Sequence, residues 1–259
     1  MSRIYELLQQ QGKEQELLGV VAAPFPSAEP RPSEPRLSEP FQATEPQLKL
    51  DPQEQEQLTK LVQRVFLTPG AEAPRVVVFT ASEPGNGSSW ICARVAETLA
   101  AQVSGTVCLI DANLKNPQLH HEFEVESHEG FSEALLGPAP ISNFARSLGR
   151  PNLRLVSCGS ALDTNLPNLG SERVRQKVRE LRAEADYILM DAPAVTASPD
   201  VAVLGAAADG VVLVLKANSS RRETARQAVE DLHVANVRIL GAVLNQRTFP
   251  IPEALYQML

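Results

Sequence analysis

The sequence predicts a doubly wound α/β domain, in which helices cover both faces of a mostly parallel sheet. From residue 75 onward, short apolar runs alternate with amphipathic stretches of helical period. The apolar runs are nearly continuous in Val, Ile and Leu, as expected for parallel strands that are buried on both faces. A glycine-containing loop at 82–89 joins the first strand to a helix. In such folds ligands bind at the carboxyl ends of the strands.

The expected elements follow one another in regular order. The expected strands are 75–81, 106–112, 153–158, 187–192, 210–217 and 237–244. The expected helices are 89–102, 131–136, 140–148, 171–184, 200–207 and 220–234. An earlier helix is predicted to begin after Asp51, because Pro52 suits the first helical position and Glu54 the third. Apolar residues at helical spacing from Leu58 to Phe66 predict that this helix faces the core.

The first fifty residues differ in composition from the rest. In 1–19, Ile4, Leu7 and Leu8 fit one face of a short helix that would gain order by docking; a frayed tail is the alternative. Residues 20–50 are predicted to form a disordered linker, because they are rich in proline and poor in large apolar groups. Its prolines are Pro24, Pro26, Pro30, Pro32, Pro35, Pro40 and Pro46. The folded domain is therefore expected at 51–259.

Composition restricts the class of protein. A net charge of −7 and a pI near 5.2 argue against non-specific binding to nucleic acid. Cys92, Cys108 and Cys158 are odd in number and form no C-x-x-C pair, which predicts buried free thiols in a reducing compartment. No run approaches 18 apolar residues and no signal-peptide core is present. These features predict a cytoplasmic protein that could still be recruited to the inner face of the membrane by a partner.

The loop at 82–89 carries the clearest indication of a ligand. Gly85 and Gly87 allow backbone N–H groups to turn inward, and the next helix adds partial positive charge for a phosphate. The Ser89 hydroxyl is placed to bind Mg²⁺. Ser88 stands where a phosphate-binding loop usually carries a lysine. A plain glycine turn without a ligand is the alternative.

Two carboxylates are expected at the same edge of the sheet. Asp111 follows the second strand and Asp191 follows the fourth. A carboxylate at this edge can activate a nucleophile or hold metal-bound water. Each Asp alone could equally be a helix cap. Together with the glycine loop, in this order, they predict a nucleotide site in which Asp111 is the candidate catalytic residue and Ser89, Asp111 and Asp191 are candidate Mg²⁺ ligands.

These three segments resemble the Walker A, Walker A′ and Walker B motifs of bacterial tyrosine kinases of capsule and exopolysaccharide synthesis, which are relatives of the MinD/ParA ATPases. The resemblance covers 51–259 and also includes 130–137, 167–171, 208–214, 238–245 and 249–256. It implies ATP or ADP with Mg²⁺ as cofactors. The residues it assigns to the cofactor are Gly85, Asn86, Gly87, Ser88, Ser89, Trp90 and Asn245. It implies a membrane polysaccharide co-polymerase or export component as partner, no nucleic acid, and a homo-oligomer.

The departures from the family pattern bear on activity. The Walker A lysine is replaced by Ser88, and the second acid of Walker A′ by Asn113. The arginine that follows Walker A′ is Lys115. The family's tyrosine-rich tail is missing, since the tyrosines are Tyr5, Tyr187 and Tyr256. The ring-forming Glu-x-x-Arg-x-x-Arg pattern has its nearest match in Glu54, Gln57 and Lys60.

These departures predict a degenerate nucleotide site that binds ATP, ADP and Mg²⁺ weakly or not at all. The leading interpretation is a pseudokinase or regulatory component of exopolysaccharide biosynthesis or export. One alternative is an active tyrosine kinase or ATPase that a membrane partner switches on. A second alternative is a MinD/ParA-like positioning ATPase, which the acidic balance disfavours because membrane and DNA contacts favour basic surfaces.

Three further features of the sequence each admit two interpretations. His120, His121 and His128 lie among glutamates, where a solvated acidic segment is favoured over a metal site. Trp90 either packs in the core or stacks on a partner, and packing is favoured. The charged run 221–223 is expected to be a solvated helix face rather than a contact surface.

Overall fold

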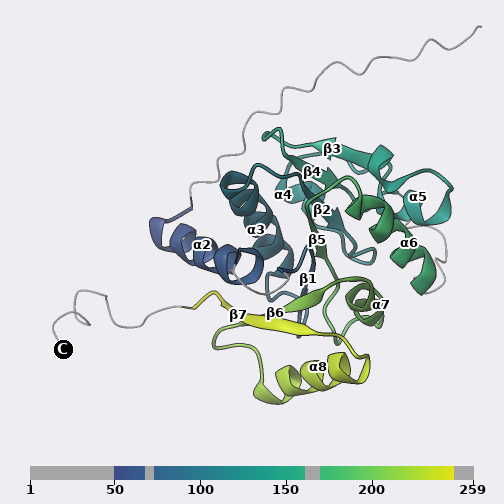
Figure 1. Ribbon diagram of the computed structural model, residues 1–259. Coiled ribbons are helices and arrows are strands. Elements are labelled where there is room, and N and C mark those ends of the chain that lie inside the picture. Colours follow the sequence, from purple (N-terminus) through teal and green to yellow (C-terminus); the bar gives the residue numbers. More distant parts are fainter. Residues whose placement is uncertain (1–49, 68–72, 161–169, 248–259) are drawn as a thin grey trace, which may run out of the picture. The chain divides into compact units, whose positions relative to one another are not determined.

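A mostly parallel sheet forms the centre of the described part of the chain, in the strand order β3-β4-β2-β5-β1-β6-β7 (Figure 1). All neighbouring strands are parallel except β3, which runs antiparallel to β4. The strands are β1 (Val76–Ala81), β2 (Val107–Asp111), β3 (Ala145–Ser147), β4 (Leu153–Val156), β5 (Tyr187–Asp191), β6 (Gly210–Lys216) and β7 (Ile239–Asn245). The predicted fold class is confirmed.

The computed structural model describes residues 50–67, 73–160 and 170–247. The expected N-terminal helix in 1–19 lies outside the described residues. So does the expected linker at 20–50, apart from Leu50. Among the described residues no helix is both long enough and apolar enough to cross a membrane.

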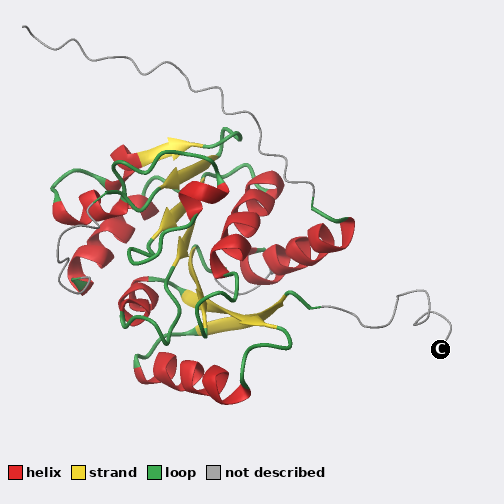
Figure 2. Cartoon of the chain, turned by 180° about the vertical axis from the view of Figure 1, so that it is seen from behind, coloured by secondary structure: helices red, strands yellow, loops and turns green. Residues whose placement is uncertain are grey.

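Helices cover both faces of the sheet (Figures 1 and 2). They are α2 (Pro52–Phe66), α3 (Ser88–Gln102), α4 (Leu119–Glu122), α5 (Phe131–Leu136), the 3₁₀ helix η2 (Ile141–Phe144), α6 (Ser171–Arg182), α7 (Asp200–Ala207) and α8 (Arg222–Val234). Buried side chains of α2, α3 and α4 share one hydrophobic cluster, and those of α5, α6, α7 and α8 share another. The sheet therefore lies between two layers of helices.

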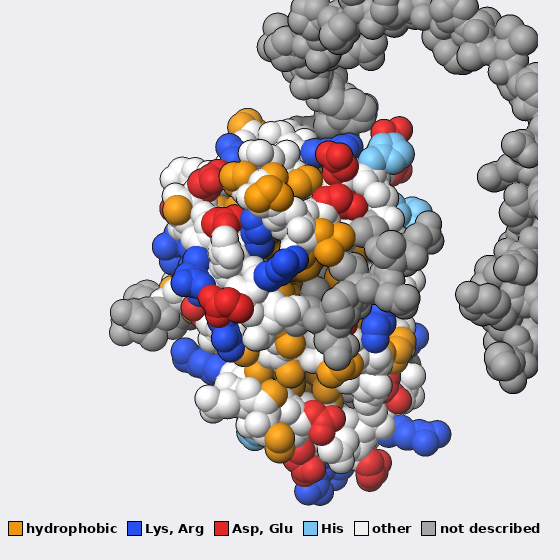
Figure 3. All heavy atoms as spheres, turned by 90° about the vertical axis from the view of Figure 1, so that its right-hand side faces the viewer, with side chains coloured by type: hydrophobic (Ala, Val, Ile, Leu, Met, Phe, Trp, Pro, Cys, Tyr) orange, Lys and Arg blue, Asp and Glu red, His pale blue; other side chains and the backbone are white. Residues whose placement is uncertain are grey.

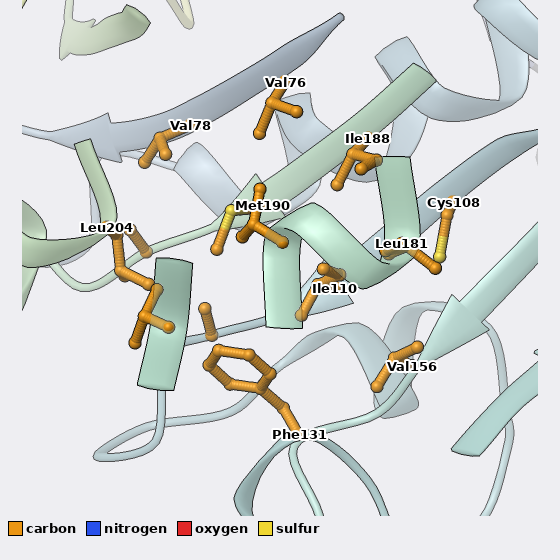
Figure 4. Close-up of a cluster of buried hydrophobic side chains, with 14 of the residues drawn as sticks. Val76, Val78, Cys108, Ile110, Phe131, Val156, Leu181, Ile188, Met190 and Leu204 are labelled. Atoms are coloured by element: carbon orange, nitrogen blue, oxygen red, sulfur yellow. The ribbon is translucent and has the colours of Figure 1, made fainter. Parts of the chain in front are cut away.

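Side chains of β1 alternate between the two clusters. Val77 and Phe79 pack with α2 and α3, whereas Val76 and Val78 pack on the opposite face. Figure 4 shows this second cluster, in which Phe131 of α5 lies near the strand side chains. Each such fully buried apolar side chain contributes roughly 1.5–3 kcal/mol. Burial on both faces explains why the strands read as continuous apolar runs.

The start of α2 is fixed as the sequence predicts. The Asp51 carboxylate accepts from the Gln53 N–H at 3.3 Å, and the Glu54 carboxylate accepts from the Asp51 N–H at 3.3 Å. These contacts satisfy N–H groups that the first turn of a helix leaves unpaired. Leu58, Val62 and Phe66 are buried, as their spacing predicts.

The prediction of a helix at 140–148 is wrong. Ile141–Phe144 form a 3₁₀ turn, and Ala145–Ser147 form the edge strand β3 beside β4. The spacing of Ile141, Phe144 and Leu148 resembles a helical stripe, but β4 offers a free edge whose backbone groups need partners. Antiparallel pairing with the next strand, which residues 148–152 join to β3, therefore overrides the helical pattern.

The surface beside α6 carries charges of both signs. Figure 3 shows Lys and Arg side chains interspersed with Asp and Glu on this side of the molecule. Within α6, Glu172 pairs with Arg179 at 2.7 Å and with Arg175 at 3.8 Å. Such exposed pairs contribute little to stability, typically about 0–1 kcal/mol each. At 221–223 the side chains are exposed, as predicted.

Asp209 ties the amino end of β1 to α6. Its carboxylate accepts from the N–H groups of Arg75 and Val76, both at 2.8 Å, and from Arg182 at 2.6 Å. Burial acts to raise the pKa of Asp209, but Arg182 and the two N–H groups outweigh it and lower the pKa. We expect Asp209→Ala to lower the free energy of unfolding by about 1.5–3 kcal/mol, as for other charged hydrogen bonds.

Urea denaturation at several pH values measures this effect. Because the folded pKa of Asp209 is depressed, its contribution is present above the unfolded pKa and disappears as the pH falls through the folded pKa. The difference between wild type and Asp209→Ala should therefore shrink in acid. The exposed Asp231 on α8 gives a control, Asp231→Ala, that should change stability little. Equal effects of the two substitutions at neutral pH would contradict the prediction.

Candidate nucleotide-binding site

The loop between β1 and α3 has the backbone that its glycines predict. Gly85 has φ of 83° and Gly87 has φ of 85°, both in the left-handed region that favours glycine. Gly87 is the N-cap of α3 and provides no side chain to cap it. The first N–H groups of α3 are therefore directed out of the helix end without a side-chain partner from the cap, which suits an anion such as a phosphate.

Asn86 braces the loop from within. The side chain is 4% exposed, and its Nδ2 donates to the hydroxyls of Ser82 and Ser220, both at 3.1 Å, and to the Val214 carbonyl at 3.4 Å. These bonds tie the loop to the end of β6. The Asn86 side chain therefore braces the loop, and the expected contact of Asn86 with the cofactor stays a prediction.

Asn245 closes over the same loop from the end of β7. Its Nδ2 donates to the Asn86 carbonyl at 2.9 Å. A Cβ added at Gly87 would lie 2.4 Å from that nitrogen, so the two residues are in close contact. Asn245 therefore lies against the loop, and its contact with the cofactor stays a prediction.

Gly87→Ala should destabilise the protein more than Gly85→Ala does. Both positions have nearly the same positive φ, so either alanine suffers backbone strain of about 1–2 kcal/mol. Only at Gly87 does the new methyl group also meet Asn245, because nothing lies within 4 Å of a Cβ at Gly85. Thermal unfolding of the two variants measures the difference.

A second set of variants, made in an Asn245→Ala protein, separates the backbone strain at Gly87 from the overlap with the Asn245 side chain. In an Asn245→Ala protein the cost of Gly87→Ala should fall to that of Gly85→Ala, since the overlapping amide is gone while the strain remains. If the cost of Gly87→Ala is the same in both backgrounds, the contact with Asn245 is not what restricts this position.

Asp111 and Asp191 are adjacent at the carboxyl edge of the sheet. They are register partners on the parallel strands β2 and β5, and neither is exposed to solvent. Asp111 accepts from the backbone N–H groups of Leu119 at 3.0 Å, Gln118 at 3.1 Å and Asn113 at 3.3 Å. Burial raises the pKa of Asp111 to about 6, and the three N–H groups limit the rise. The sequence predicted both residues at one edge of the sheet, and the structure shows that they are neighbours there.

Asp191 is a buried carboxylate with unused oxygens. Neither oxygen has a hydrogen-bond partner among the described residues. Burial raises the pKa of Asp191 well above its usual range, and the charge of Asp111 raises it further. The Ser89 hydroxyl is near enough to oppose this rise in pKa. Two adjacent carboxylates and a hydroxyl are the oxygen donors that Mg²⁺ prefers, so these residues fit a divalent cation.

Ser88 begins α3 and is half-buried. Its short hydroxyl replaces the side chain that would bring a positive charge to bound phosphates. Among the described residues, Asp111 accepts only backbone N–H groups, and Asp191 has no partner. The site therefore offers a helix end for an anion and carboxylates for a cation, and Ser88 itself brings no positive charge to it.

The two Walker A′ departures play different parts. Asn113 is 9% exposed, and its side-chain oxygen accepts from the Asn116 N–H at 3.3 Å, which stabilises the local turn. Lys115 is exposed to solvent. Neither residue contacts the Asp191 carboxylate, whose oxygens lack partners in the described chain.

Arg94 is a residue of the site region that the sequence reasoning missed. Its side chain is 1% exposed and lies 2.7 Å from the Glu97 carboxylate and 3.6 Å from that of Glu122. Glu122 ends α4, and the first N–H of α4, that of Leu119, binds Asp111. Arg94 thus joins α3 to the turn that holds Asp111. A single arginine within the apolar run 91–96 was the available signal, because a buried charge requires partners.

Other predicted features have definite positions. Trp90 is half-buried, packs against the α2–α3 cluster and lines a groove of about 1220 Å³ between α2 and β7. The three cysteines are free and buried, as predicted. The described residues contain no group of three or more His, Cys, Asp or Glu side chains that could hold a metal ion.

Comparison with known proteins gives consistent relatives. No family model matches the sequence. The chain is 30% identical over 169 residues to the tyrosine-protein kinase YwqD of Bacillus subtilis, which covers 65% of this chain and 71% of YwqD. It is also 30% identical over 170 residues to the putative tyrosine-protein kinase EpsB of Ralstonia solanacearum. That match covers 66% of this chain and 22% of EpsB, so the chain spans about a fifth of the longer relative.

Solved structures share the fold. The kinase domain of the Escherichia coli tyrosine kinase ETK superposes with a TM-score of 0.68 at 22% identity, covering 76% of this chain and 79% of that domain. A ParA family ATPase from Chlorobium tepidum gives a TM-score of 0.55 at 20% identity, covering 66% and 74%. The Walker-type loop, the paired carboxylates and the extent of the match to YwqD together lead to one conclusion: the chain belongs to the family of bacterial tyrosine kinases.

Proposed function

We propose that this chain is a kinase-like P-loop protein with a degenerate nucleotide site, acting as a pseudokinase or regulatory component of exopolysaccharide biosynthesis or export. One observation carries the proposal. Ser88 occupies the lysine position of a phosphate loop that is otherwise fully formed, with its glycines in the left-handed region and its helix end open. The scaffold is kept while a main catalytic charge is absent.

The missing charge should affect catalysis more than folding. A hydrogen bond to a charged group contributes about 1.5–3 kcal/mol to binding. Loss of a preorganised charge at a transition state typically lowers the rate by about 10²–10³. Phosphoryl transfer depends mainly on positioning and charge, so the absence of the lysine is most costly there. Asn113 in place of a second acid also removes an anion beside the metal position.

The same residues define what nucleotide binding would remain. Ser89, Asp111 and Asp191 would hold Mg²⁺, and the α3 N-terminus would meet the phosphates of ATP or ADP. Bound Mg²⁺ neutralises phosphate charge. The chain's own residues would orient the nucleotide, with Asn245 held at the loop by its bond to the Asn86 carbonyl. Weak binding is the expected result.

A second candidate function is an active tyrosine kinase or ATPase that a membrane partner switches on. The retained pair Asp111 and Asp191 favours it, because the chain keeps two buried carboxylates side by side. With a pKa of about 6, Asp111 is suited to accept a proton near neutral pH. A partner would have to supply the missing positive charge. A MinD/ParA-like positioning role has support only from the shared fold.

The proposed partner is a membrane polysaccharide co-polymerase or export component that the chain meets at the inner face of the membrane. Family membership supports this assignment. The acidic balance supports a protein partner over nucleic acid. Assembly into a homo-oligomer is part of the proposal, although the altered pattern at Glu54, Gln57 and Lys60 argues against a ring of the usual family type.

Turnover by the purified full-length chain tests the proposal. Wild type is expected to show no Mg²⁺-dependent ATP hydrolysis above that of an Asp111→Ala variant, and Asp231→Ala serves as a surface control. Clear ATP hydrolysis that Asp111→Ala abolishes and Asp231→Ala preserves would contradict the pseudokinase proposal. Phosphotyrosine in cells that disappears with Asp191→Ala would establish the second candidate instead.

A further inference from the structure

A groove runs beside the nucleotide loop. One wall is α2, the other is the end of β7, and the first turn of α3 with Trp90 lies between them. Its volume is about 1220 Å³. β7 is an edge strand of the sheet, and among the described residues its outer edge pairs with no other strand. We call this feature the α2–β7 groove; it is lined by α2, by Gly87, Trp90 and Ile91, and by residues 242–247.

The groove exposes apolar surface. Leu61 of α2, Trp90 and Val243 are only partly buried, and Leu244 is 55% exposed. Half-exposed aromatic and aliphatic groups around one concave surface are typical of a binding site for an apolar segment. Charged residues of both signs from α2, such as Glu54 and Lys60, form the rim.

We propose that residues 248–259 of the same chain dock in the α2–β7 groove and cover Trp90. The chain leaves β7 through Arg247, which itself lines the groove. The segment's only charged side chain is Glu253. Its large apolar side chains are Phe249, Ile251, Leu255, Tyr256, Met258 and Leu259.

The segment has sufficient reach. Extended chain spans about 3.3–3.6 Å per residue, so the segment extends up to about 40 Å from Arg247. A helix rises about 1.5 Å per residue, which makes the wall formed by α2 roughly 22 Å long. The segment can therefore cross the whole groove without any movement of β7.

Tethering favours this segment over a separate partner. A ligand joined by a short flexible link has an effective concentration in the millimolar range, so weak apolar contacts suffice for occupancy. A second protein would have to compete against this advantage.

Docking would cover part of the nucleotide loop. Gly87 and Asn245 line the same groove, so a docked segment would compete with a nucleotide base for this end of the site. This consequence alone rests on the proposed function. The docking itself concerns only the groove and the segment, and it is tested without nucleotide.

The fluorescence of Trp90 provides the test, because the chain contains a single tryptophan. The full-length chain is compared with a variant carrying Phe249→Ser, Ile251→Ser and Leu255→Ser. We expect the variant to emit at longer wavelength and to lose protection from acrylamide quenching. The matched control changes polar positions of the same segment, Glu253→Ser and Gln257→Ser, and should leave both readings unchanged. Equal urea midpoints for the two variants confirm that the domain is folded.

Adding the segment in trans completes the test. A synthetic peptide of residues 248–259 should restore the emission and protection of the apolar variant in a saturable manner, and a scrambled peptide should not. Identical Trp90 readings in wild type and the apolar variant would overturn the proposal. Wild-type readings that change on dilution would also overturn it, because they would assign the groove to a second copy of the chain. A silent ATP titration has no bearing on these readings.

Discussion

Ser88→Lys is expected to create firm binding of ATP with Mg²⁺ in a chain that otherwise binds it weakly. The loop already presents its N–H groups, and Asp111 and Asp191 are in place, so the substitution restores the missing positive charge at the phosphate end of the site. A charged hydrogen bond of about 1.5–3 kcal/mol corresponds to a gain in affinity of about 10- to 150-fold. Calorimetric titration of ATP-Mg²⁺ into the full-length chain measures it.

The lysine should be tolerated at this position. Ser88 is half-buried at the first residue of α3, so a long side chain can place its ammonium group at the loop or in solvent. Ser88→Met is the matched control, because it adds a long unbranched side chain without the charge. Micromolar binding by wild type, or equal gains from Lys and Met, would show that Ser88 is not what weakens the site.

Asp191→Asn is expected to stabilise the ligand-free protein. The carboxylate is buried, has no hydrogen-bond partner among the described residues, and lies beside Asp111. Its raised pKa means that ionisation at neutral pH costs folding free energy. An amide removes that charge and can donate to Asp111 on the neighbouring strand. Replacing poorly compensated buried charges typically gains about 1–4 kcal/mol.

Thermal unfolding at neutral pH measures the gain, at about 2–4 °C per kcal/mol for a domain of this size. The sign reverses at Asp209, where the carboxylate is paired and its pKa is depressed, so Asp209→Ala should lower the melting temperature under the same conditions. In acid the advantage of Asp191→Asn should vanish, because the wild-type carboxyl is then protonated. If Asp191→Asn melts below wild type at neutral pH, the buried Asp191 carboxylate does not destabilise the ligand-free protein, and the prediction is contradicted.

Local signals predicted most of the architecture. Continuous apolar runs located six strands, and the Asp51 cap with the stripe from Leu58 to Phe66 located α2, because these signals depend on near neighbours in the chain. The strand β3 and the turn α4 were missed. Both are short, and each is held by a contact that apolar periodicity does not reveal: β3 by the edge of β4, and α4 by the Asp111 carboxylate.

The sequence by itself determined which groups the site contains: glycines in the loop, Ser88 in place of a lysine, and one aspartate at the end of each of two strands. Only the tertiary structure decided how they act. It turned Asn86 inward to brace the loop, brought Asn245 against Gly87, and placed the buried Asp191 carboxylate beside Asp111. These outcomes depend on contacts between residues far apart in the chain, whose geometry is set by the packing of the whole sheet rather than by local conformational preference.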